Sequence, residues 1–258
     1  MSSYSDFAFF YDSLMNDVDY KGRSDYLLKL FSEYGKKPEL LLDLACGTGG
    51  FSNQMAQKGI EVIGVDISEE MLGIAREKSY DSSVDVLYLC QDAAELDLYG
   101  TIDGAICCMD SLNHITDIKK LEKAISKVSL FLEKDSLFIF DVNTPFKHEH
   151  ILGNNTFVIE EESIYCVWQN EYDAKKGMTY INLDFFAEKD GVYERYSEEF
   201  CERAYSIENL CELVKKHHFD IVGIFDDLSE NPLREDSERA IFVLRKNKET
   251  NGKSLHII

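Results

Sequence analysis

Apolar residues gather in short, unbroken runs through the first half of the chain. Five such runs lie at 40–45, 61–66, 86–90, 102–108 and 136–142. They lack the polar alternation of a half-exposed strand, which is typical of strands buried on both faces of a sheet. Helical spacing of apolar residues fills the stretches between them, at 51–58, 69–79 and 118–132, and Ser68 is a predicted N-cap. This alternation predicts βαβ units with parallel strands.

Residues 155–205 follow a different pattern. Runs rich in aromatic and β-branched residues are joined by turn signals at 173–177 and at Asp190-Gly191, and an Asp-Gly pair between such runs is a strong hairpin signal. An amphipathic helix with a Ser cap is predicted at 206–218, and two apolar runs follow at 220–225 and 240–245. Because these runs complete the first pattern, we expect 155–205 to be an insertion.

The predicted fold is therefore α/β. We expect a doubly wound, mostly parallel seven-stranded sheet with helices on both faces, plus an antiparallel β insertion after the fifth strand. The corresponding division of the chain is a sheet domain at 1–150 and 206–246, an insertion at 151–205 that covers the substrate site, and a flexible tail at 247–258.

Charge narrows the range of partners. The 258 residues include 27 Lys and Arg against 48 Asp and Glu, for a net charge of −21, which argues against nucleic acid and anionic membranes as partners. No apolar run reaches the ~18–20 residues of a membrane span, and the N-terminal stretch is acidic where a signal peptide is basic. We expect a soluble, cytoplasmic protein. Seven cysteines without C-x-x-C spacing are expected to be reduced core residues.

The turn after the first predicted strand carries the candidate chemistry. Asp43 ends the strand, and Gly47 and Gly49 allow a tight turn and a close approach of the backbone to a ligand. Asp66 ends the second strand, where a carboxylate can accept both hydroxyl hydrogens of a ribose. The turn lacks the G-x-G-x-x-G spacing of a pyrophosphate site, and Asp43 would repel phosphate. A nucleoside that carries positive charge is the favoured ligand.

Four segments together resemble a class I, Rossmann-like, S-adenosylmethionine-dependent methyltransferase. They are LDLACGTG (42–49), GVDIS followed by ML (64–72), QDA (91–93) and FDVNTP (140–145). The resemblance implies S-adenosylmethionine as cofactor and assigns roles to matching positions. Asp43 and the loop from Gly47 to Gly49 would hold the methionine end, and Asp66 the ribose. The remaining cofactor contacts would be Ile67 and Met71 on the adenine face, Asp92 and Ala93 at the adenine N6 edge, Met109, and Ala45, which replaces the commoner Gly.

The N-terminal segment, residues 4–30, is similar to a subset of this family. The subset comprises glycine N-methyltransferase, amino-sugar N-methyltransferases and uncharacterised bacterial relatives, in which a helix closes over the cofactor and a β insertion covers the substrate. By that resemblance Tyr11, Tyr20 and Arg23 are lid residues, with Arg23 forking the methionine carboxylate. The alternatives are that the two tyrosines pack the helix and that Arg23 is solvated.

Methyl transfer requires little of the protein beyond alignment, exclusion of water and removal of one proton. His114 follows the fourth strand and is a candidate general base, or else a helix-start or packing residue. Asp110 is a candidate to orient the substrate, or else a helix cap. His148-Glu149-His150 has weak spacing for a metal, and we predict no metal site. The aromatics of the insertion either line an acceptor pocket or pack against the sheet domain.

The predicted function is methyl transfer from S-adenosylmethionine to nitrogen or oxygen of a small-molecule acceptor, by in-line displacement. The alternatives are a methyltransferase for tRNA or a protein, and a non-catalytic nucleoside-binding module of the same fold. An NAD-linked oxidoreductase is disfavoured by the glycine spacing. The pattern leaves the acceptor and the oligomeric state open.

Overall fold

Seven strands form one sheet in the computed structural model, which describes residues 5–161 and 164–249. They are β1 (Leu40–Leu44), β2 (Glu61–Asp66), β3 (Leu87–Cys90), β4 (Ile102–Cys107), β5 (Leu132–Asn143), β10 (Phe219–Asp226) and β11 (Arg239–Lys246). Their order across the sheet is β10-β11-β5-β4-β1-β2-β3. The pairings among β1 to β5 are parallel, whereas β11 runs antiparallel to both neighbours. The predicted mostly parallel seven-stranded sheet is confirmed.

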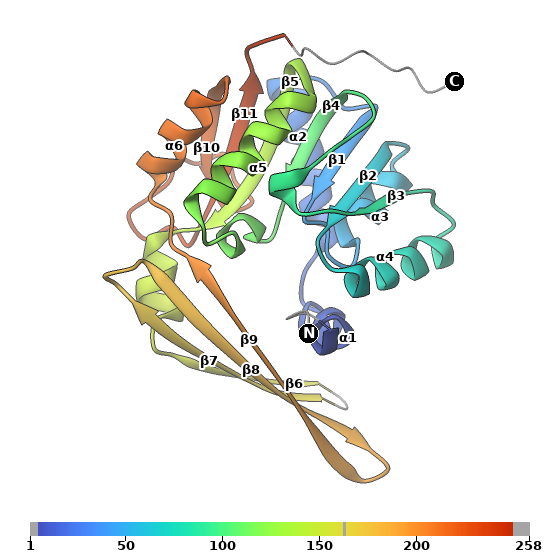
Figure 1. Ribbon diagram of the computed structural model, residues 1–258, viewed down its shortest axis with the longest axis vertical. Helices are drawn as coiled ribbons and strands as arrows, with labels where there is room; N and C mark the ends of the chain where they lie inside the picture. The colour runs from blue at the N-terminus through green and yellow to red at the C-terminus, as the bar shows by residue number, and fades with distance from the viewer. Residues whose placement is uncertain (1–4, 162–163, 250–258) are drawn as a thin grey trace.

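Alternate side chains of the central strands pack against helices on opposite faces of this sheet, which confirms the doubly wound arrangement (Figure 1). On β5, Leu137 and Ile139 pack toward α2 and α3, while Phe138 and Phe140 pack toward α5 and α6. The helices are α1 (Ser5–Leu14), α2 (Tyr20–Tyr34), α3 (Gly50–Gln57), α4 (Glu69–Asp81), α5 (Ile118–Phe131) and α6 (Ile207–Lys216). Ser68 caps α4 as predicted, accepting a hydrogen bond from the Met71 amide at 3.2 Å.

The segment after β5 forms a separate antiparallel sheet. It begins with a π-helix, η3 (Lys147–Leu152), and continues through β6 (Thr156–Glu161), β7 (Ile164–Asp173), β8 (Met178–Lys189) and β9 (Val192–Arg203) in that order across the sheet. Both predicted turns are found, after Asp173 and at Asp190-Gly191. The β-rich run that precedes the first of these turns comprises two strands, β6 and β7.

Helix α1 lies between α4 and this second sheet, at the end of the main sheet where β1 to β5 terminate (Figure 1). Phe10 of α1 stacks on Phe185 of β8, with ring centroids 4.8 Å apart. Two short 3₁₀ turns, η1 (Ala93–Glu95) and η2 (Ser111–His114), follow β3 and β4. The main sheet, α1 and the second sheet therefore surround one space.

All seven cysteines are free; Cys107, Cys108 and Cys166 are buried, whereas Cys90 is exposed. No helix within the described residues is long and apolar enough to cross a membrane. Most of the predicted tail, from residue 250 on, lies outside the described residues.

Candidate functional site

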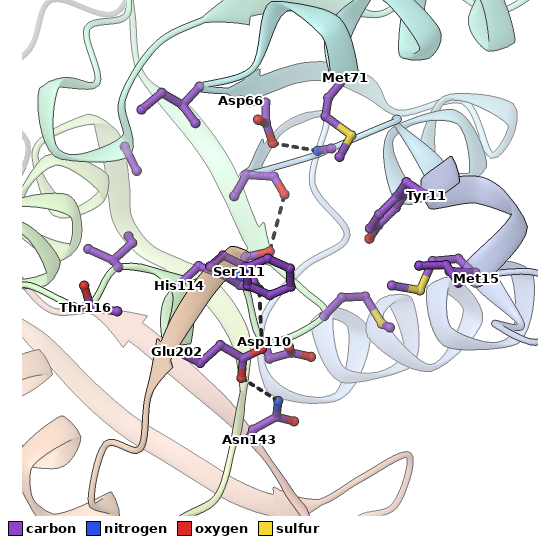
Figure 2. A pocket seen from close by; sticks show the side chains of 18 of the residues that line it. Tyr11, Met15, Asp66, Met71, Asp110, Ser111, His114, Thr116, Asn143 and Glu202 are labelled. Atoms are coloured by element: carbon purple, nitrogen blue, oxygen red, sulfur yellow. Dashed lines mark hydrogen bonds and ion pairs between the residues drawn. The ribbon is translucent and has the colours of Figure 1, made fainter. Parts of the chain in front are cut away.

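A cavity of about 710 Å³ lies at the edge of the main sheet where β1, β2, β4 and β5 end. Its size is within the range of ~300–1,000 Å³ that is typical of ligand sites. Figure 2 shows Tyr11 of α1 and Met15, which directly follows α1, reaching into it, with Asp66 and Met71 on one side and Asp110, Asn143 and Glu202 on another. One continuous space is therefore lined by the sheet edge, α1 and the second sheet.

The turn after β1 has the left-handed backbone that its glycines predict. Ala45, Gly47 and Gly49 have φ values of +57°, +54° and +74°. A Cβ on Gly49 would lie 2.5 Å from the Tyr88 hydroxyl, whereas one on Gly47 would meet no protein atom within 4 Å. Gly47 and Ala45 line the cavity. The open side of Gly47 thus offers backbone to a ligand, and Ala45 holds a conformation that a glycine adopts without strain.

Asp66 is the residue that joins this turn to the next helix. Its Oδ2 accepts a hydrogen bond from the Gly47 amide at 2.8 Å, and its Oδ1 accepts one from the Ser68 amide at 3.0 Å. Burial raises the pKa of Asp66, and these two amide hydrogen bonds oppose the rise. The carboxylate lines the cavity with further lone pairs for a diol.

The residues predicted for the adenine lie together beyond Asp66. Ile67, Met71, Asp92 and Ala93 all line the cavity, and Ile67 is 60% exposed. Asp92 Oδ1 accepts a hydrogen bond from the Ala94 amide at 2.9 Å. Apolar side chains beside a backbone-anchored carboxylate suit a flat base with a polar edge.

Asp43 lies behind the turn and not on the cavity wall. It is 1% exposed, and its Oδ2 accepts a hydrogen bond from Ser52 Oγ at 2.6 Å. Burial raises the pKa of Asp43 to about 7. From this position Asp43 anchors the first turn of α3 beneath the glycine loop, and it is not one of the residues that line the cavity.

The three predicted lid residues differ in their placement. Tyr11 lines the cavity, and Figure 2 shows its hydroxyl directed inward. Tyr20 packs edge-on against Phe51, with centroids 5.2 Å apart. Both guanidinium Nη atoms of Arg23 bind the carboxylate of Asp227 at 3.0 Å. Neither Tyr20 nor Arg23 lines the cavity, so Arg23 would have to leave Asp227 to fork a methionine carboxylate.

Asp110 belongs to a buried charge cluster that the sequence did not indicate. Arg239 binds Asp110 Oδ1 at 2.6 Å and also binds Asp141. Asp141 in turn accepts the amides of Met109 and Asp110 at 2.8 and 2.7 Å, holding both residues at positive φ. Burial alone would raise the pKa of Asp110, but the charges of Arg239, Lys147 and His114, together with the Arg239 hydrogen bond, outweigh burial and lower the pKa to about 2. Asp110 therefore lines the cavity as an ionised carboxylate that is paired with Arg239.

His114 meets a carboxylate from the second sheet. Its Nε2 lies 3.7 Å from Oε1 of Glu202 on β9. Its Nδ1 is buried and has no hydrogen-bond partner in the part of the chain that the structure describes. The accessible edge of the ring is therefore the Nε2 side, where the second sheet supplies Glu202.

Several cavity residues were assigned no role from the sequence, and four of them are polar residues around Glu202: Asn143, Lys147, Arg239 and Glu202 itself. Asn143 connects two of them, because its Nδ2 donates to Glu202 Oε2 at 3.2 Å and its Oδ1 accepts from Lys147 Nζ at 3.0 Å. Asn143 could have been found, since it ends a buried strand at the ligand-binding edge. Arg239 reaches the same edge because β11 runs antiparallel and begins opposite Asn143. The alternating charges of β9 do not distinguish Glu202 from its neighbours.

The two histidines of the His148-Glu149-His150 segment lie in different surroundings. His148 is fully buried, with Nδ1 2.8 Å from Thr179 Oγ1, and burial lowers its pKa to about 4. His150 instead packs against Phe146 with the two rings tilted and their centroids 4.8 Å apart. Ligand atoms of Asp110, His114 and Glu202 do lie within 4.8 Å of one another, but the Arg239 guanidinium already occupies Asp110.

Comparison with known proteins places this geometry in a family. Residues 41–135 match the family model described as a methyltransferase domain. The Bacillus subtilis protein named "Putative methyltransferase YqeM" is 31% identical over 246 residues, which cover 95% of this chain and 98% of that protein. The crystal structure of an S-adenosylmethionine-dependent methyltransferase from Clostridium acetobutylicum is 32% identical, with a TM-score of 0.86, over 95% of this chain and 99% of that one. The chain belongs to the S-adenosylmethionine-dependent methyltransferases.

More distant methyltransferases share the architecture. The sugar N-methyltransferase KedS8 from Streptoalloteichus has a TM-score of 0.76 at 17% identity, over 94% of this chain and 93% of that one. At this identity the likeness is one of fold. The predicted family, cofactor and enzyme class are confirmed for this methyltransferase, whereas the roles of individual residues stay predictions.

Proposed function

We propose that this methyltransferase transfers the methyl group of S-adenosylmethionine to nitrogen or oxygen of a small molecule enclosed in the cavity. The observation that carries the proposal is the composition of that cavity. The side that contains the glycine turn and Asp66 has the groups expected for the cofactor, and side chains of the second sheet close the opposite side. A reacting pair held in one enclosed space satisfies the alignment that an in-line displacement requires.

The residues of the first side fit the cofactor. Gly47 has open space where a Cβ would stand, and Asp66 beside it retains lone pairs for the ribose hydroxyls. Ile67 and Met71 offer apolar contact for the adenine, with Asp92 at its edge. When bound, the cofactor supplies an electrophilic methyl group on a positively charged sulfur. The nearby carboxylates complement that charge.

The second side of the cavity supplies acceptor binding and removal of a proton. His114 is proposed as the general base through Nε2, because this is the nitrogen on the accessible edge of the ring. Asp110 is proposed to fix the cavity wall through its pairing with Arg239. Apolar side chains from the second sheet exclude water from the space between them.

A transfer screen tests the proposal. The protein is incubated with methyl-labelled S-adenosylmethionine and a panel of metabolite amines, hydroxy acids and amino sugars, with bulk tRNA as a control acceptor. We expect label in one class of small molecule and none in tRNA. Label in tRNA alone, or no binding of S-adenosylmethionine by calorimetry, would contradict the proposal.

A further inference from the structure

Glu202 is a buried carboxylate whose hydrogen bonding is incomplete. Its side chain is 5% exposed and lines the cavity. Oε2 accepts a hydrogen bond from Asn143, but Oε1 accepts none from the residues that the structure describes. Two imidazoles that could carry positive charge lie within 4 Å of the carboxylate. Nε2 of His114 is 3.7 Å from Oε1, and Nε2 of His148 is 3.8 Å from Oε2. A carboxylate buried in this way is costly until a charged donor reaches it.

The permanent cations of the same region are already engaged. Arg239 is bound by Asp110 and Asp141. Lys147 donates to Asn143 Oδ1 at 3.0 Å, and burial lowers the pKa of this lysine. Asp110 faces Glu202 as a further negative charge, and burial together with that charge raises the pKa of Glu202. Within the described residues, Glu202 is thus the carboxylate of this cluster that no arginine or lysine side chain binds.

The wall beside Glu202 is apolar. Trp168, Leu183 and Phe200 come from the second sheet and line the cavity with Ile159. The indole nitrogen of Trp168 donates a hydrogen bond to Asn170 Oδ1 at 2.7 Å, so this donor does not need a hydrogen-bond acceptor on a ligand. A molecule that fits here presents hydrocarbon to these side chains and a cationic donor to the carboxylate.

We propose that the methyl acceptor is a primary or secondary amine with an apolar carbon framework, and that its ammonium group binds Oε1 of Glu202. This inference rests on the proposed function and names its substrate class. Glu202 then selects amines over alcohols, because an alcohol brings no positive charge to the buried carboxylate.

The chemistry balances with the residues present. The bound ammonium gives one proton to Nε2 of His114, and the sulfonium charge nearby favours that loss. The nitrogen lone pair then forms the N–C bond, and the electrons of the broken C–S bond stay on sulfur. The products are S-adenosylhomocysteine and an amine with one more methyl group, which carries the positive charge. Glu202 pairs with the imidazolium and with the product.

The test uses matched amine and alcohol probes on the full-length protein loaded with S-adenosylhomocysteine. Benzylamine is compared with benzyl alcohol, and cyclohexylamine with cyclohexanol, by calorimetry. We expect at least one amine to bind about tenfold or more tightly than its alcohol, and Glu202→Gln to remove that preference. Glu199→Gln is the control, because it makes the same change of charge on an exposed position of β9.

Each result has a defined meaning. Alcohols that bind as tightly as their amines in the wild-type protein would overturn the inference, and so would an amine preference that survives in Glu202→Gln. The affinity for S-adenosylhomocysteine, measured first in each variant, reports that the variant is folded. If the cofactor product binds and no amine is preferred, the substrate class is wrong while the proposed function stands; if it does not bind the wild-type protein, both fail.

Discussion

Asp66 carries the clearest prediction at the scale of single residues. Its carboxylate holds the Gly47 and Ser68 amides and is proposed to hold the ribose. Asp66→Ala should weaken S-adenosylmethionine binding by about 1.5–3 kcal/mol, because charge-assisted hydrogen bonds are lost. Calorimetry measures the change, with Glu61→Ala, an exposed position at the other end of β2, as control. Equal affinities for the two variants would show that Asp66 is not the ribose ligand.

We expect Asp43 to make the stability of the folded protein depend on pH. Its pKa of about 7 in the folded protein lies above the ordinary value of 3.8, so between these values the folded state binds more protons than the unfolded one. Its contribution to stability is therefore greatest below about pH 4 and is lost as pH rises toward 7. Asp43→Asn should raise the Tm of the cofactor-free protein more at pH 8 than at pH 4.5. In free energy of unfolding, the stabilisation at pH 8 should exceed that at pH 4.5 by an amount on the order of a few kcal/mol. A Tm difference that is constant with pH would contradict this placement.

His114 is tested through its effect on turnover. With an acceptor from the screen, His114→Ala should lower kcat about a hundredfold or more and change KM little, since general-base catalysis contributes roughly 10²–10⁴-fold. The rate is measured from pH 6 to 9. His150→Ala serves as a control on an exposed histidine that does not line the cavity. Turnover that is unaffected across this range would rule out the base assignment.

At the scale of elements, α1 is the proposed lid, and it is held by contacts at three points. Asp12 accepts hydrogen bonds from Thr48 of the glycine turn at 2.7 Å and from Lys78 of α4 at 3.0 Å. Phe10 stacks on the second sheet through Phe185, while Tyr11 faces the cavity. Because these contacts join three separate parts of the fold, we predict that the position of α1 determines how tightly the cavity is closed.

Asp12→Ala tests this tie. The ion pair is partly exposed, so its loss should cost up to about 1 kcal/mol. We expect the dissociation rate of S-adenosylmethionine to rise up to about fivefold, with faster amide hydrogen exchange in α1 and little change in Tm. Asp17→Ala, at an exposed position just after α1, should have no such effect. Unchanged dissociation and exchange would mean that these contacts do not hold the lid.

At the scale of the whole molecule, we propose that the main sheet holds the cofactor and that the second sheet holds the acceptor. Residues proposed for the cofactor come from the main sheet and its turns, whereas Trp168, Leu183 and Glu202 come from the second sheet. Tyr205 follows the second sheet but is buried, and its hydroxyl donates to the Ile115 carbonyl. We therefore predict that the separable part runs from 156 to 203, slightly shorter than the predicted insertion.

Replacing 156–203 by a short Gly-Ser linker should abolish methyl transfer. The affinity for S-adenosylhomocysteine should fall by no more than about tenfold, since α1 loses an aromatic contact worth about 0.5–1.5 kcal/mol. Calorimetry and the transfer assay measure the two effects, and circular dichroism confirms folding. Loss of cofactor binding in a folded deletion variant would show that the second sheet belongs to the cofactor site.

The sequence by itself determined the main sheet, its helices and much of the cofactor side. The reason is that these features are local: a strand buried on both faces requires an apolar run, and the turn at Gly47 requires a left-handed backbone. The order of these segments along the chain also places Asp66 and Ile67 at the edge where parallel strands end. Such positions follow from residues within a few places of one another.

Only the tertiary structure decided the acceptor side. Glu202 meets Asn143 and His114 across 59 and 88 positions of the chain, and Arg239 meets Asp110 across 129. These contacts depend on strand register and on the antiparallel direction of β11, where a shift of one residue turns a side chain to the opposite face. Likewise, the family resemblance predicts Arg23 at the methionine carboxylate, whereas in the structure its guanidinium pairs with Asp227, which lies 204 positions away in the chain.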